Sequence, residues 1–159
     1  MGVSEKGQVS GYDVLIAIII FLLMFAILRQ IPISNLTNAI DDVSYNEMRI
    51  YSQQAMDSML KTNGYPIDWD ASNVEIIGLS ERPNIIDSEK VSQLLLLDYD
   101  IAQDLLALGK YDFNLMIDSV DNSKDFSYGV SIPNDKEVIV IERVVYYGGE
   151  ANATLYVFK

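Results

Sequence analysis

The sequence contains no cysteine and no histidine. These absences exclude disulfide bonds, thiolate zinc sites, cysteine nucleophiles and histidine-based acid–base catalysis. Basic residues are also scarce, because 11 lysines and arginines stand against 23 aspartates and glutamates and leave a formal net charge of −12. Nucleic-acid binding needs a concentrated basic surface, so we expect no nucleic-acid partner.

One apolar run stands out near the N-terminus, where residues 14–28 read VLIAIIIFLLMFAIL. Fifteen apolar residues are fewer than the ~20 that usually span a bilayer as a helix. Extension back to Val9 reaches about 20 residues but includes Ser10 and Asp13. On this basis we predict a hydrophobic transmembrane helix over residues 8–31.

Two conventional interpretations of this run compete. A secretory signal needs a basic segment before the apolar core and small residues after it. Here Asp13 adjoins the run, and Arg29 and Pro32 follow it, so a secretory signal is disfavoured. An uncleaved membrane anchor fits the hydropathy almost as well as a processed one and stays open as an alternative.

The string KGQVS at residues 6–10 lies directly before the apolar run. It resembles the class III signal peptide of archaeal type IV pilin-like proteins of the methanogen type. The resemblance implies that a prepilin peptidase cuts between Gly7 and Gln8 and removes residues 1–7, with Lys6 and Ser10 contributing to recognition of the leader. The helix would then serve as membrane anchor in the precursor and as the spine of the assembled fibre.

The resemblance also implies an assembly role for Asp13, and the central position of Ile19 in the apolar run predicts one for Ile19. The family usually carries an acidic residue at the fifth mature position, which is Tyr12 here, and the acid follows one residue later at Asp13. The new amino group of Gln8 and the carboxylate of Asp13 could pair between subunits. Ile19 lies in the middle of the apolar run, where an unpaired charge would be costly.

Residues 32–159 are predicted to form an α+β head. Apolar residues recur at helical spacing over residues 40–62, and Gly64 and Pro66 then supply stop signals. Residues 74–79 read as a short strand, Asp87 and Ser88 as helix N-cap candidates, and residues 91–108 as one or two helices. Strands are predicted over residues 111–117, 126–132, 137–147 and 153–158, the last two joined as a hairpin at Gly148-Gly149. Short connections favour an antiparallel C-terminal sheet.

Several short segments of this region also resemble pilin-like heads: residues 63–69, 77–79, 106–113 and 142–145.

Acidic clusters offer candidate metal ligands, because divalent cations prefer hard oxygens. They are Asp68 with Asp70, Asp98 with Asp100, and the group Asp118, Asp121, Asn122 and Asp125. None has the spacing of an EF-hand, and such pairs are common by chance in an acidic chain. We interpret them as turns and helix caps, and predict no metal and no cofactor. No nucleophile elbow, P-loop or dinucleotide fingerprint is present, so an enzyme is the least favoured class.

Two glycosylation sequons, at Asn35 and Asn152, fall in the predicted head. They are consistent with a head outside the cell and a precursor whose N-terminus is cytoplasmic.

The sequence thus favours a pilin or minor pilin, homo-oligomeric in a surface filament, with adhesion as a possible role. Its expected partners are prepilin peptidase, the membrane and the pilus assembly machinery. The alternative is a membrane-anchored extracellular binding domain that does not polymerise.

Overall fold

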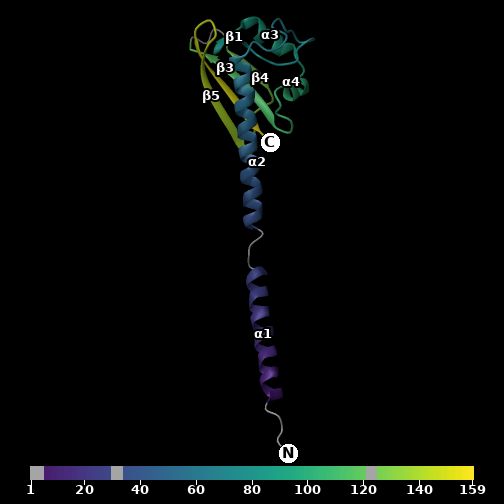
Figure 1. The fold of residues 1–159 in the computed structure, drawn as a ribbon. Helices are drawn as coiled ribbons and strands as arrows, with labels where there is room; N and C mark the ends of the chain where they lie inside the picture. Colours follow the sequence, from purple (N-terminus) through teal and green to yellow (C-terminus); the bar gives the residue numbers. More distant parts are fainter. Residues whose placement is uncertain (1–5, 30–33, 121–124) are drawn as a thin grey trace, which may run out of the picture. The chain divides into compact units, whose positions relative to one another are not determined.

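The computed structural model describes the backbone of residues 6–29, 34–120 and 125–159, and the side chains of residues 11–27, 43–120 and 125–159. The chain divides into two compact units, Met1–Val43 and Ser44–Lys159. The first unit holds helix α1, Lys6–Arg29, and the start of helix α2, Ser34–Lys61 (Figure 1). The second unit, called the head below, holds the rest of α2 and all the other elements.

The transmembrane helix expected over residues 8–31 is a wrong prediction. Within the described ranges of the chain, no helix is both long and apolar enough to cross a membrane. The physical reason is length. The unbroken apolar run has fifteen residues, and reaching the usual ~20 means counting polar Ser10 and Asp13 as part of the span.

The head is α+β, as predicted, and its strands form one six-stranded sheet in the order β1-β2-β5-β6-β3-β4. The strands are β1 Ser80–Arg82, β2 Ile85–Ile86, β3 Asp112–Ser119, β4 Phe126–Gly129, β5 Val138–Tyr146 and β6 Glu150–Phe158. The β5–β6 hairpin is confirmed, with Tyr146 opposite Glu150 at the turn. The sheet is not wholly antiparallel, however, since β2 pairs parallel to β5 at Ile85 and Tyr146.

The predicted strand over residues 74–79 is the second correction. Only Ile76 in that segment makes a β-bridge, to Tyr65, and the first strand begins at Ser80. Backbone polar groups of residues 79–84 instead satisfy the last turn of α2. The Leu79 N–H donates to the Met59 carbonyl at 2.8 Å, and the Asn84 N–H donates to the Leu60 carbonyl at 2.7 Å. A helix leaves its last carbonyls without partners, and this segment supplies them.

This junction requires glycine at position 78. A Cβ built on Gly78 would lie 2.1 Å from the Gly64 nitrogen and 2.4 Å from the Thr62 carbonyl oxygen. Both neighbours are backbone atoms, which move only if the whole turn moves. The close approach explains why a glycine interrupts the apolar residues Ile77 and Leu79, both of which are fully buried.

Two short helices follow, α3 at Ser88–Leu96 and α4 at Tyr99–Leu105. Asp87 caps α3 as predicted, with its side chain accepting from the Glu89 N–H at 2.8 Å. Asp98 caps α4 in the same way, accepting from the Asp100 N–H at 3.0 Å. A cap of this kind satisfies an otherwise unpaired donor at the start of a helix.

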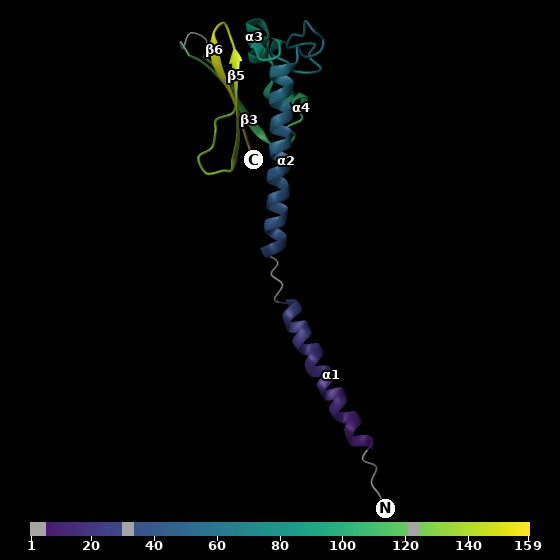
Figure 2. The same cartoon turned by 60° about the vertical axis from the view of Figure 1, so that its left-hand side comes forward.

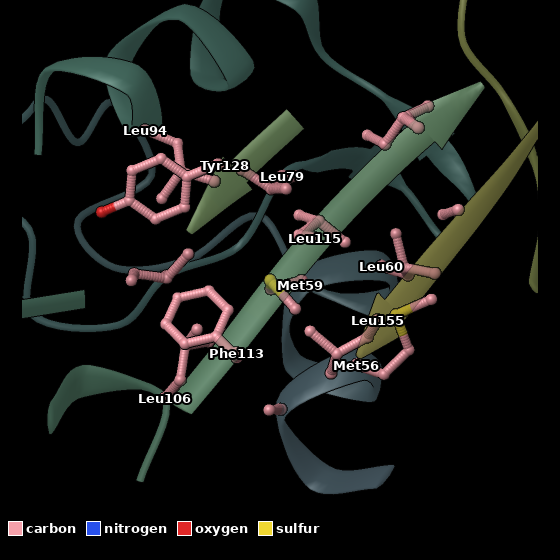
Figure 3. Packing of buried hydrophobic residues seen from close by; sticks show 14 of the residues in the cluster. Met56, Met59, Leu60, Leu79, Leu94, Leu106, Phe113, Leu115, Tyr128 and Leu155 are labelled. Atoms are coloured by element: carbon pink, nitrogen blue, oxygen red, sulfur yellow. The ribbon is translucent and has the colours of Figure 1, made fainter. Parts of the chain in front are cut away.

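The core of the head lies between α2 and one face of the sheet (Figures 1 and 2). From the helix it takes Met56, Met59 and Leu60, and from the strands it takes Phe113, Leu115 and Leu155, all at most 1 % exposed (Figure 3). The Phe113 ring also stacks with Tyr99 at 5.1 Å and meets Tyr128 at 5.9 Å between ring centroids. The predicted apolar stripe of residues 40–62 is confirmed as a core face from Met48 onward, whereas Val43, at 68 % exposure, lies outside the core.

Candidate functional site

The surface of α1 is the most unusual feature of the chain. Every large apolar side chain between positions 14 and 27 is exposed, and Ile19, at 49 %, is among the least exposed of them. The apolar character covers all sides of the helix rather than one stripe. A helix of this kind is stable only where something other than water covers it.

Aromatic residues add shape to this surface. Phe21 and Phe25, one turn apart, stack with their ring centroids 6.3 Å apart and their planes 17° apart. Stacked rings one turn apart form a rigid ridge, which a neighbouring helix can pack against. The predicted assembly residue Ile19 lies in the same helix, two positions before Phe21.

Asp13 is the one charged side chain among residues 11–27, and it is exposed. The side chains of its predicted partner Gln8 and of the leader residues Lys6, Gly7 and Ser10 lie outside the described ones. The helix backbone nevertheless begins at Lys6, so the predicted cleavage bond lies in its first turn.

The acidic pairs behave as turns and caps. Asp70 Oδ1 accepts from the Ser72 hydroxyl at 2.6 Å and from the Ser72 N–H at 2.7 Å. The hydrogen bond from the Ser72 side chain, followed by that from its backbone, holds the pKa of Asp70 below its usual value. Asp98 is occupied as the α4 cap, with Asp100 in the first turn of that helix.

The third acidic group is also engaged within the fold. Asp125 Oδ1 accepts from the Ser119 N–H at 3.1 Å, which closes the connection between β3 and β4. Asp118 lies near the end of β3, whereas Asp121 and Asn122 lie outside the described residues. Among the residues that the structure does describe, no three acidic side chains are grouped so as to hold a metal ion.

An acid-lined pocket of about 450 Å³ brings Asp68 and Asp70 to the start of α3, beside Asp87 and Glu89. Its basic member, Lys90, is 7 % exposed and donates from Nζ to the Asn63 carbonyl oxygen. Burial lowers the pKa of Lys90, against the opposing effect of Asp87 and Asp68. These contacts tie α3 to the loop after α2, so the pocket has a structural explanation.

The two sequons lie in different settings. Asn152 is exposed on the middle strand β6, opposite Val144 of β5 and Asp118 of β3. Asn35 is the second residue of α2, and its side chain lies outside the described ones. The structure therefore leaves Asn152 accessible to a modifying enzyme on the face of the sheet that points away from the core.

Sequence reasoning missed a groove between α2 and β5. It has a volume of about 260 Å³ and is lined by Tyr45, Arg49 and Gln53 of the helix and by residues 138–143. Arg143 lies at its β5 side, so the groove brings two of the chain's few arginines together. They are 94 positions apart in the sequence, and no local pattern relates them.

Comparisons with known proteins do not identify the chain. No family model, no curated protein and no solved structure matches it. The likeness to pilin-like proteins therefore rests on the short motifs quoted above. The function has to be argued from the residues of this chain.

Proposed function

We propose that the chain is a structural subunit of a pilus-like surface filament, polymerised through α1 and displaying the head outside the cell. The observation that carries this proposal is the exposed apolar surface on all sides of α1. The string KGQVS supports it, because in pilin-like proteins such a motif marks where the precursor is cut before the helix enters a fibre.

The size of the apolar surface gives it energetic weight. Twelve large apolar side chains between positions 14 and 27 are about half exposed or more. Covering them is worth on the order of 10 kcal/mol, since full burial of one such side chain contributes ~1.5–3 kcal/mol. Gains of that size offset the entropy lost when subunits associate.

The distribution of the surface favours a filament over a dimer. A dimer made by two helices covers one stripe of each and leaves the opposite sides in water. A helix that is apolar all round is covered completely only when it has several neighbours. Heterologous contacts that repeat along an axis provide such neighbours, and they generate open helical assemblies.

Removal of residues 1–7 fits this arrangement. The segment carries Glu5 and Lys6, and burying such charges without partners in a helical core would cost several kcal/mol per ion. Cleavage after Gly7 leaves a new amine at Gln8, which could pair with Asp13 of another copy. The proposal thus assigns prepilin peptidase as a processing partner.

The test compares two matched substitutions in cells that produce the full chain. Ile19→Asp places a charge on α1, and Ile101→Asp places one on α4, where Ile101 is 51 % exposed against 49 % for Ile19. Electron microscopy should show filaments lost in the first variant and retained in the second. Mass spectrometry of wild-type filaments should find Gln8 at the N-terminus. Normal filaments from Ile19→Asp, or Met1 at their N-terminus, would refute the proposal.

A further inference from the structure

Strand β5 has one edge that the described residues of the chain leave largely unpaired. Along its other edge it pairs with β6 over its full length, Val138 opposite Phe158 through Tyr146 opposite Glu150. On the open side the partner is β2, which meets β5 at Tyr146 alone. Within the described parts of the chain, residues 138–145 therefore have no strand paired along that edge.

The direction of the backbone groups along this edge can be derived. The Tyr146 N–H donates to the Asn84 carbonyl at 2.8 Å, on the side away from β6. Backbone groups alternate sides along a strand, and the β5–β6 register runs without a bulge. The N–H groups of Val144, Glu142 and Val140 consequently also point to the open side.

The usual protections of a free edge are weak here. Natural proteins protect such edges with proline, bulges, short strands or inward-pointing charge. β5 is nine residues long, VIVIERVVY, without proline or glycine. Val140 and Val144, 55 % and 64 % exposed, add apolar side chains beside the edge. The Arg143 guanidinium donates to the Glu142 carbonyl at 3.0 Å and so covers one acceptor.

The same edge borders the groove that holds Arg49 and Arg143. Among the described residues, the ion pairs are Lys61 with Asp57 and Lys110 with Glu47, so neither arginine forms an ion pair there. Glu142 also lines the groove, so the lining carries two positive charges and one negative charge, a net charge of +1 in a chain whose net charge is −12. This net positive lining would attract a segment that carries carboxylates.

We propose that the open edge of β5 is the docking site for an extended acidic segment from the head of a second copy of this chain, which adds a strand beside β5. The choice of a second copy rests on the proposed filament, in which neighbouring heads meet. Backbone hydrogen bonds to Val140, Glu142 and Val144 hold the added strand, and the two arginines select its carboxylates. Two β5 edges do not pair with each other, because that would set the arginines of both copies close together. The contact is therefore heterologous and can continue from head to head.

The experiment uses the full chain, both in filaments and dispersed in detergent, with a benzophenone photo-cross-linker replacing Val140. The expected product has twice the mass of the chain, and peptide mapping places the link in an acidic segment of the head. The same cross-linker in place of exposed Glu75 should give at least tenfold less cross-linked dimer. Filaments whose Val140 adducts contain another protein, or no partner at all, overturn the inference while the filament proposal stands.

Substitutions in the same cross-linkable chain separate backbone pairing from charge. Glu142→Pro removes an N–H that points away from β6, so it spares the β5–β6 ladder and should lower the dimer yield at least tenfold. Glu142→Thr keeps that N–H and should leave the yield unchanged. Arg49→Glu combined with Arg143→Glu should also lower the dimer yield at least tenfold. This double variant tests the charge contribution independently of how the proline variant folds. Unchanged yields in the double variant refute the inference. Absence of wild-type filaments, with the Val140 dimer still formed in detergent, would refute the filament proposal instead.

Discussion

The two long helices of this chain differ in how far their apolar side chains are buried. α2 has 28 residues, and among those whose side chains are described a single apolar stripe, Met48, Ala55, Met56, Met59 and Leu60, is buried in the core of the head. α1 has 24 residues, and its apolar side chains at positions 14–27 are exposed on every side. The α2 stripe finds its partners inside the head.

The difference shows in composition as well as in burial. In α2, aspartates, asparagines and glutamines lie between the residues of the apolar stripe and form a polar face that stays in water. Between positions 14 and 27, α1 has no polar residue at all. A polar face restricts a helix to one buried side, and its absence permits neighbours all round. In the proposed filament, α1 could therefore pack against neighbours on every side because it has no polar face.

The largest difference is expected from truncating one apolar side chain in each helix. Met56→Ala removes a fully buried side chain and should lower the free energy of unfolding of the head by about 3 kcal/mol. Leu22→Ala, at a 57 % exposed position of α1, should leave it unchanged. Urea denaturation of the detergent-dispersed full chain, followed by fluorescence of buried Trp69, measures both. Equal losses of unfolding free energy in the two variants would contradict the conclusion that Met56 belongs to the core of the head and Leu22 does not.

A smaller loss is expected at the junction that ends α2. Gly78→Ala places a Cβ within 2.1 Å of the Gly64 nitrogen, so the turn must shift and the head should lose about 2 kcal/mol. Gly149→Ala is the control, because nothing lies within 4 Å of a Cβ built there. The same fluorescence assay applies. A Gly78→Ala variant as stable as Gly149→Ala would show that this close approach is not required.

Alkaline pH should destabilise the head through two tyrosines. Burial raises the pKa of Tyr99 and of Tyr128 to about 12 each, from an ordinary value of ~10. The neutral rings are therefore favoured by folding, so their stabilisation is complete below pH ~10 and is lost as pH rises through 12. Urea midpoints at pH 9 and pH 11.5 should differ, and Tyr99→Phe or Tyr128→Phe should reduce the difference. A fall of equal size in both variants and wild type would contradict this origin.

Local patterns predicted much of the head. The stripe of α2 from Met48 onward, the Asp87 cap and the β5–β6 hairpin depend on neighbours in the sequence, and all three are confirmed. The strand expected over residues 74–79 failed because its neighbours in space are the last carbonyls of α2, which no local pattern reveals. The groove with Arg49 and Arg143 was missed for the same reason. The expected membrane span failed on length alone, since polar residues had to be counted into it.

The smallest expected effects come from two aspartates, Asp13 in α1 and Asp87 in the head. Asp87→Ala removes the cap of α3 and should lower the free energy of unfolding of the head by about 1 kcal/mol, with filaments still formed. Asp13→Ala removes the one charge among residues 11–27 and makes no change in the head, so the unfolding curve should match wild type. If Asp13 pairs with the Gln8 amine of another copy, filament yield by electron microscopy should fall in this variant alone. The opposite pattern, with Asp13→Ala filaments normal and its head destabilised, would place Asp13 in the fold and remove it from assembly.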